Sequence, residues 1–178
     1  MQQVSYDSSI QFSKQTKQQQ SVVVRRAGHQ DIPALMELSY DSASESGVVE
    51  QYCEQHNREH MTSVLDRGVS FVACSGEDVI GAVLFVPIDT GYSLLKHMES
   101  AHLYVRNGRR SLSVVRALIK AVKDYSTENN IVMFMHQVSY PTAIAGEKAQ
   151  TTRVAALYKY FGLEGSYGAS YVVRPGQP

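Results

Sequence analysis

Apolar residues follow two spacings along this chain, and each spacing predicts one kind of element. Runs rich in β-branched and other apolar residues predict strands at Ser21–Arg26, Val69–Cys74, Val79–Val86, Glu99–Val105, Ile131–Val138 and Tyr167–Val173. Apolar residues at steps of three and four predict helices after Asp31, after Gly47, along Val114–Tyr125 and along Thr152–Phe161. Strands and helices therefore alternate over most of the chain.

The order of these elements is strand, two helices, three strands, helix, strand, helix and strand. The tight turn Ser75–Asp78 joins two of the strands and predicts an antiparallel hairpin. A hairpin followed by strand–helix–strand crossovers gives a mixed sheet with helices packed on it. We therefore predict an α/β fold in which helices flank a mixed, mostly antiparallel central sheet.

Particular residues mark where the first two helices begin and end. Asp31 is expected to cap the first helix, and Pro33 suits its first turn, where a missing N–H costs nothing. Gly68 is expected to end the second helix. The stripe that defines the second helix is Val49, Tyr52, Cys53, His56, His60 and Val64.

The chain has 178 residues, a length that fits one domain with a single sizeable core. We assign this domain to residues 21–178. Residues 1–20 are rich in Gln and Ser and show no periodicity, which is typical of a flexible tail or a partner-binding arm. As an arm, this segment would join copies of the chain or a larger assembly.

Charge and cysteine content change this picture little. Lysines and arginines number 17, as do aspartates and glutamates, so the net charge of zero argues against nucleic acid as a partner. No apolar run is long enough to span a bilayer, and no apolar signal begins the chain, so we expect a cytoplasmic protein. Cys53 and Cys74 lack the spacing of metal ligands, and we expect buried thiols and no metal site.

The segment Leu103–Tyr125, LYVRNGRRSLSVVRALIKAVKDY, joins a predicted strand to a helix through an arginine-rich turn. A helix N-terminus offers unpaired N–H groups and the positive end of a dipole, so this junction favours phosphate binding. A solvated basic turn is the alternative. A nucleic-acid site at Arg106, Arg109, Arg110 and Arg116 is less favoured, because aromatic residues do not alternate with these arginines.

Four segments resemble motifs of the GNAT superfamily of N-acetyltransferases. These are VVVRRAGHQDIPALMEL, VIGAVLFVPI, LYVRNGRRSLSVVRAL and RVAALYKYFGLE, and their order covers Ser21–Val173. The resemblance implies a GNAT-like fold with acetyl-coenzyme A (acetyl-CoA) as co-substrate. It also implies transfer of the acetyl group to a primary amine: a protein lysine, an N-terminus or a small molecule. Short, glycine-poor GNAT domains like this one are also similar to those carried by bacterial viruses.

The resemblance places the cofactor at the segment after the fourth strand. Arg110 takes the position of the Arg or Gln of the family signature. Ser113 stands where the family usually has glycine, and Val115 stands where it usually has glycine or alanine. The main phosphate contacts are expected from the N–H groups of Ser111, Leu112, Ser113, Val114 and Val115. A backbone N–H at a bulge in the fourth strand, among Leu103, Tyr104 and Val105, is expected to hold the acetyl carbonyl. Because glycine allows the closest approach to a pyrophosphate, we expect weakened cofactor binding.

The resemblance also suggests the catalytic groups. Tyr158 matches the general-acid tyrosine of the family, and Tyr160, two residues further along the helix, faces another direction. Glu99 matches the catalytic glutamate of the protein-lysine-acetylating branch, and His102, His136 or a water relay are alternative bases. Strand alternation puts Glu99 and His102 on opposite faces unless a bulge intervenes.

The sequence leaves the acceptor and one rival interpretation open. In the family the acceptor site is shaped by segments that here are Ser39–Asp66 and Ser139–Gln150. Glu45, Glu50 and Glu54 would attract a cationic amine or simply form a polar helix face. The rival interpretation is a catalytically silent GNAT-like domain that serves as a structural or binding module, which the missing glycines and the Gln-rich arm favour.

Overall fold

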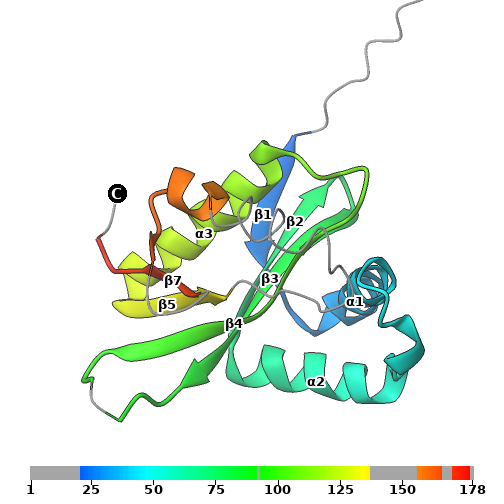
Figure 1. The fold of residues 1–178 in the computed structure, drawn as a ribbon, viewed down its shortest axis with the longest axis horizontal. Helices are drawn as coiled ribbons and strands as arrows, with labels where there is room; N and C mark the ends of the chain where they lie inside the picture. Colours follow the sequence, from blue (N-terminus) through cyan, green and yellow to red (C-terminus); the bar gives the residue numbers. More distant parts are fainter. Residues whose placement is uncertain (1–20, 92, 137–155, 166–169, 177–178) are drawn as a thin grey trace, which may run out of the picture.

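The computed structural model describes residues 21–91, 93–136, 156–165 and 170–176 (Figure 1). The N-terminal arm, the acceptor segment Ser139–Gln150 and the first residues of the predicted late helix and last strand lie outside the described residues. Within them, no helix has the length and apolar character needed to cross a membrane.

Seven described strands form one sheet in the order β1-β2-β3-β4-β5-β7-β6. They are β1 (Val22–Arg26), β2 (Val69–Ser75), β3 (Asp78–Ile88), β4 (Lys96–Val105), β5 (Ile131–His136), β6 (Glu164–Gly165) and β7 (Ser170–Val173). Neighbouring strands are antiparallel except β4 and β5, which are parallel. The predicted mixed, mostly antiparallel sheet is confirmed. The short strand β6 was missed, because two residues carry no periodicity.

Helices cover both faces of the sheet (Figure 1). Helices α1 (Ile32–Glu45) and α2 (Glu54–Arg67) pack on one face, and α3 (Leu112–Asn129) and residues 156–160 pack on the other. Each face has its own core, because strand side chains alternate between the two. The core under α3 includes Phe85 and Leu118, and the core under α1 and α2 includes Leu35 and Leu84.

The helix after β4 follows its predicted stripe. Val114, Leu118, Ile119 and Val122 are buried along α3 at steps of three and four residues. The Ser111 hydroxyl caps this helix by accepting the Val114 N–H at 3.3 Å. The amphipathic pattern therefore fixes which face of α3 lies on the sheet.

The start of α1 differs from the prediction in one respect. The helix begins beside Asp31 with Pro33 in its first turn, as expected, but the Asp31 side chain makes no capping bond to the helix. Its carboxylate instead accepts the Gly28 N–H at 2.9 Å and pairs with Arg25 at 2.7 Å. The Arg25 guanidinium lowers the pKa of Asp31 and holds a buried charge in place. Arg25 is a stronger partner for Asp31 than a main-chain N–H of the helix, because a hydrogen bond from a guanidinium to a carboxylate is charge-assisted.

The second predicted helix begins later than expected. Val49 starts a short 3-10 turn, and extended backbone at Cys53 separates this turn from α2. The buried residues of α2 are Met61 and Val64, whereas His56 and His60, at four-residue steps before Val64, are exposed. Cys53 is exposed too, so the expectation of two buried thiols is right for Cys74 and wrong for Cys53.

Candidate active site

Strands β4 and β5 run together and then separate (Figure 1). Their parallel pairing joins Lys96–Glu99 to Ile131–Phe134. Beyond Glu99, β4 continues to Val105 against β3, while β5 continues to His136 against β7. The sheet therefore opens after Glu99, between the ends of two adjacent parallel strands.

A β-bulge lies at the start of this opening. Ser100 pairs with Phe85 and His102 pairs with Leu84, so Ala101 is the extra residue on β4. A bulge reverses the alternation of side chains beyond it. Because Glu99 opposes Val86 and His102 opposes Leu84, and both of these contact the core under α1 and α2, Glu99 and His102 share that face. The sequence placed Glu99 and His102 on opposite faces unless a bulge intervened, and the structure has this bulge at Ala101.

The bulge lies two residues before the expected segment Leu103–Val105, so that part of the prediction is wrong. After the bulge the ladder is regular, and the Arg106 N–H donates to the Ile80 carbonyl at 2.9 Å. Alternation along an antiparallel ladder then directs the Tyr104 main chain towards β3. The main-chain groups of Leu103 and Val105 point the other way, into the separation of β4 and β5.

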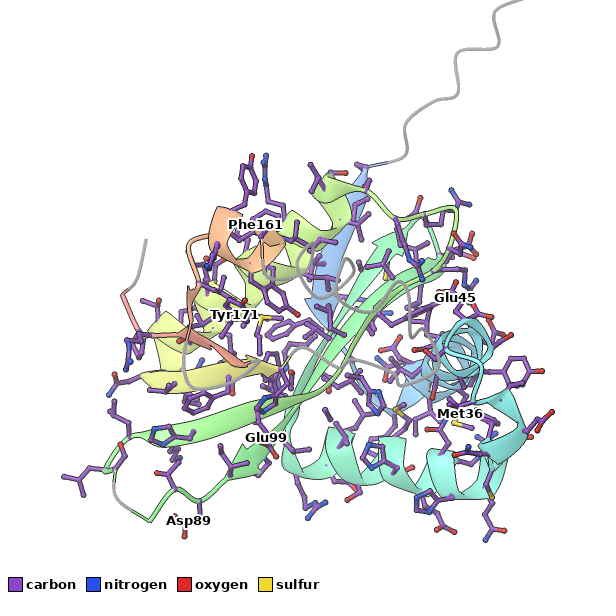
Figure 2. The ribbon with its side chains drawn as sticks, in the orientation of Figure 1. Met36, Glu45, Asp89, Glu99, Phe161 and Tyr171 are labelled. Atoms are coloured by element: carbon purple, nitrogen blue, oxygen red, sulfur yellow. The ribbon has the colours of Figure 1, made fainter. Side chains whose placement is uncertain are left out.

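Glu99 and His136 meet beside this separation. The Glu99 Oε2 atom lies 3.1 Å from His136 Nε2, and the two side chains are 40% and 35% exposed. Figure 2 shows Glu99 on β4 beside the end of β5. The His136 main-chain N–H donates to the Ser100 hydroxyl at 2.8 Å. The structure thus joins two of the three side-chain candidates for the base in one hydrogen-bonded pair.

The third candidate, His102, has a different partner. Its Nε2 atom lies 3.3 Å from Nε2 of His60 on α2, with the two rings edge to face. Burial, and to a lesser extent His60, lowers the pKa of His102 to about 4. The imidazole is therefore uncharged at neutral pH and forms part of the contact between β4 and α2.

The two tyrosines of the late helix face opposite environments. Tyr158 is 1% exposed and packs edge-on against Tyr171, with ring centroids 4.9 Å apart. Burial, and to a lesser extent Tyr171, raises the pKa of Tyr158, so its hydroxyl stays protonated. Tyr160 is 65% exposed, and its hydroxyl accepts a hydrogen bond from Arg116 at 2.9 Å. Tyr158 therefore lies in the core under α3, as the apolar stripe of an amphipathic helix also predicts, and Tyr160 lies at the surface.

Two arginines after β4 are paired with carboxylates of α1. Arg106 lies 3.0 Å from Glu37 and 3.2 Å from Asp41. Arg110 forms an ion pair with Glu45, donates to the Val105 carbonyl at 2.9 Å and lies over the Tyr104 ring. These carboxylates are spaced by four residues and so share one face of α1. Sequence reasoning missed this pairing, although the spacing of Glu37, Asp41 and Glu45 was visible.

The first turn of α3 also uses some of the N–H groups expected to bind phosphate. Val114 donates to the Ser111 hydroxyl, and Val115 donates to the Ser111 carbonyl at 3.2 Å. Leu112 and Ser113 lie in the first turn of α3, where the main-chain N–H groups have no acceptor within the helix. The Val115 side chain is half-buried and packs against the core under α3.

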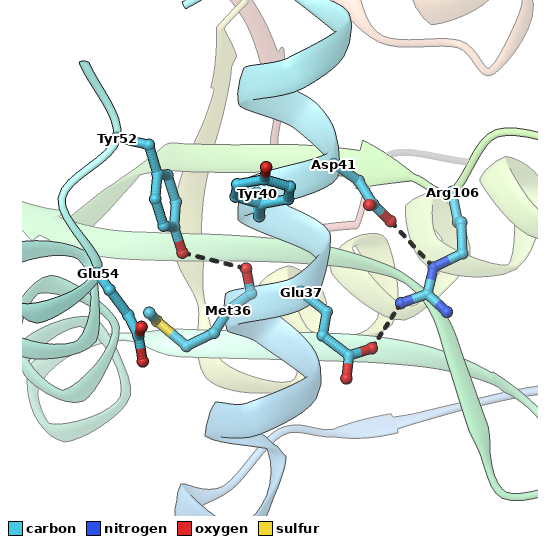
Figure 3. Close-up of a pocket in the computed structure, with 7 residues that line it drawn as sticks. All are labelled: Met36, Glu37, Tyr40, Asp41, Tyr52, Glu54 and Arg106. Carbon is cyan, nitrogen blue, oxygen red and sulfur yellow. Dashed lines mark hydrogen bonds and ion pairs between the residues drawn. The ribbon is translucent and has the colours of Figure 1, made fainter. Parts of the chain in front are cut away.

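A cavity of about 500 Å³ lies on the outer side of α1 (Figure 3). It is lined by Met36, Glu37, Tyr40, Asp41, Tyr52, Glu54 and Arg106. Four of these residues belong to the segment expected to shape the acceptor site. Arg106 neutralises two of its carboxylates, and Glu54 pairs with Arg58 at 3.2 Å, so the charge does not single out a cationic acceptor.

Among the residues that the structure describes, no group of three or more His, Cys, Asp or Glu side chains is placed to hold a metal ion. The polar groups at the strand separation are instead a carboxylate, an imidazole and main-chain N–H groups, which suit proton transfer and binding of a carbonyl.

Similarity to known proteins is found in the fold and not in the sequence. No protein-family model matches the sequence, and no curated protein matches it. Many solved structures match the fold, and the following three are examples. A GNAT-family acetyltransferase from Staphylococcus aureus is 13% identical, with a TM-score of 0.63 over 86% of this chain and 99% of its own.

The other two were crystallised in complex with CoA. A GNAT-family N-acetyltransferase from Escherichia coli is 20% identical, with a TM-score of 0.58 over 86% of this chain and 81% of its own. An aminoglycoside N-acetyltransferase is 15% identical, with a TM-score of 0.62 over 83% of this chain and 91% of its own. The likeness at this identity is one of fold, and the chain has the fold of the GNAT-family acetyltransferases.

Proposed function

We propose that this chain is an acetyl-CoA-dependent N-acyltransferase that acetylates a primary amine. The observation that carries the proposal is the Glu99–His136 pair beside the separation of β4 and β5. The pair supplies a proton acceptor, and the N–H groups of Leu103 and Val105 face the same separation. The acceptor amine is a protein lysine, an N-terminus or a small molecule.

Glu99 is the general base of the proposed reaction. A lysine amine with a pKa of about 10.4 is neutral roughly once in 2,500 at pH 7, so acetyl transfer to it needs proton removal. The Glu99 carboxylate accepts this proton directly or through a water molecule. His136 orients the carboxylate by its 3.1 Å contact, and the imidazole is the alternative acceptor.

Main-chain donors hold the co-substrate in this proposal. The N–H groups of Leu103 and Val105 hold the acetyl carbonyl, and those of Leu112 and Ser113 hold phosphate oxygens. Glu45 counts against co-substrate binding in part, because it pairs with Arg110, the arginine that matches the family signature.

Tyr158 is the general acid of the proposed reaction. The amine nitrogen forms a bond to the acetyl carbon, the carbon–sulfur bond breaks, and the departing thiolate takes the proton of the Tyr158 hydroxyl. Tyr158 belongs to the core under α3, whereas Glu99 points to the face of α1 and α2. Acid and base therefore belong to opposite faces of the sheet, which suits two substrates that bind from opposite sides.

A specific observation also favours the second candidate, a catalytically silent module. Arg110 is held by Glu45, by the Val105 carbonyl and over the Tyr104 ring, so it is not free to bind phosphate without rearrangement. A domain that had lost its co-substrate would tolerate such a contact. The two candidates differ in whether acetyl-CoA binds at all.

Thermal denaturation with and without acetyl-CoA separates the two. Ligand at a hundred times its dissociation constant adds about 2.7 kcal/mol to the free energy of unfolding, a shift of a few degrees for a domain of this size. Release of free thiol is then measured with a lysine peptide, a peptide with a free N-terminus and an aminoglycoside. A melting temperature unmoved by millimolar acetyl-CoA would contradict the proposal and leave the silent module.

A further inference from the structure

Ser100 occupies a special position on β4. It follows Glu99, the last β4 residue paired with β5, and precedes Ala101, the extra residue of the bulge. Its main chain is paired with Phe85 of β3. Ser100 therefore lies at the point where β4 keeps one neighbouring strand and leaves the other.

The Ser100 side chain reaches across this point. Its hydroxyl accepts the His136 main-chain N–H at 2.8 Å, although the regular pairing of the two strands ends two residues earlier, at Phe134. A side-chain oxygen thus takes the role that a strand carbonyl has in a regular ladder. This bond fixes the end of β5 relative to β4 where the strands move apart.

His136 is therefore held at two points by consecutive residues of β4. Ser100 holds its main chain at 2.8 Å, and Glu99 contacts its imidazole at 3.1 Å. Glu99 opposes Phe134 in the parallel register, and His136 lies two residues further along β5, so their side chains share one face of the sheet. The position of the imidazole against the carboxylate then depends on where the end of β5 lies.

We infer that Ser100 is a positioning residue: its hydroxyl holds the end of β5 so that His136 stays against Glu99. The inference rests on the proposed function, because it gives the Glu99–His136 pair a task in acetyl transfer. Ser100 acts through His136 and does not touch the reacting atoms. Loss of the hydroxyl removes its bond to the His136 N–H, loosens the end of β5 and lowers turnover.

The test compares Ser100→Ala, which removes the hydroxyl, with Ser100→Thr, which keeps it on a residue that strands favour. Ser93→Ala is the matched control, because the Ser93 hydroxyl also accepts a main-chain N–H, that of Leu95 at 3.2 Å, in the exposed turn before β4. Amide hydrogen exchange at His136 and steady-state kinetics are measured for all four proteins.

Ser100→Ala should speed exchange of the His136 amide by about five- to tenfold. It should lower kcat by about ten- to one hundredfold while KM for acetyl-CoA changes by about twofold or less. Ser100→Thr should restore both properties, and Ser93→Ala should change neither.

Three results would overturn the inference: unchanged His136 exchange in Ser100→Ala, unchanged kcat despite faster exchange, or a Ser100→Thr protein that behaves like the alanine variant. A wild-type protein that acetylates no amine is a different outcome. It removes the proposed function and the catalytic part of this inference, while the exchange rates still decide whether Ser100 holds β5.

Discussion

Glu99 and His136 stand 37 positions apart in the sequence, yet their side chains meet with 3.1 Å between Oε2 and Nε2. They meet because β4 and β5 are parallel neighbours whose pairing ends at Glu99 and Phe134. Glu99 is the last residue of β4 that pairs with β5, and the two strands separate directly after it. A carboxylate and an imidazole are thereby placed at the edge of an opening in the sheet.

Replacing Glu99 by glutamine tests the base. Glu99→Gln keeps the size of the side chain and removes its ability to take a proton, so turnover with a lysine peptide should fall by about a hundredfold. An N-terminal amine with a pKa near 8 is about one-tenth neutral at pH 7, so its acetylation should fall less. Steady-state rates with the two peptides measure the difference. Equal losses would count against Glu99 as the base.

Replacing Tyr158 by phenylalanine tests the acid. Tyr158→Phe preserves the ring that packs against Tyr171 and removes the hydroxyl. Turnover should fall by about ten- to a thousandfold, while the affinity for acetyl-CoA changes little. Tyr160→Phe is the control, because Tyr160 is exposed and contacts Arg116, and it should keep full turnover. Full activity of Tyr158→Phe would remove this residue from the mechanism.

The ion pair between Arg110 and Glu45 predicts competition with the co-substrate. Glu45→Gln removes the charge that engages Arg110, so acetyl-CoA should bind about two- to fivefold more tightly, the effect expected of a partly exposed ion pair. Isothermal titration calorimetry gives the affinity. Glu37→Gln removes a carboxylate from Arg106 instead and should leave the affinity unchanged. Weaker binding by Glu45→Gln would show that Glu45 supports the site.

The half-buried imidazole of His102 predicts that acid destabilises the protein. The pKa of His102 lies near 4 in the folded chain and near 6.5 in the unfolded chain, so the unfolded chain takes up a proton first as the pH falls. The contribution of His102 is present in full above pH 6.5 and is lost as the pH falls towards 4. The slope is at most about 1.4 kcal/mol per pH unit.

Urea denaturation between pH 4 and pH 7 measures this slope. His102→Gln should reduce it clearly, and a smaller part should remain with His60, whose pKa is also lowered, mainly by burial. A slope that His102→Gln leaves unchanged would show that other groups cause the acid sensitivity.

The fold could be predicted from the sequence because periodicity reports directly on which side of an element is buried. The stripe of α3 and the apolar runs of β2 and β3 appear in the structure where the pattern places them. The pattern was misleading in α2, where the exposed His56 and His60 share the helical spacing of buried residues. Spacing shows that residues share a face, and Val64 of this face is buried, but spacing does not show how much of the face is covered.

The candidate site was predicted in part. Sequence reasoning named Glu99, His136 and Tyr158 from their types and their places in the motifs, but it treated Glu99 and His136 as alternatives. It also treated the arginines after β4 as free cations, although Arg106 and Arg110 meet carboxylates of α1. Both facts depend on contacts between elements far apart in the chain.

The sequence by itself determined the elements, their order and the residue types available for chemistry, because these follow from local spacing and side-chain character. Tertiary structure alone decided that Glu99 pairs with His136, that Ala101 bulges and that Tyr158 faces inward. The physical reason is that strand register, a one-residue bulge and the rotation of a helix on a sheet are set by packing across the whole core. No local segment carries that information.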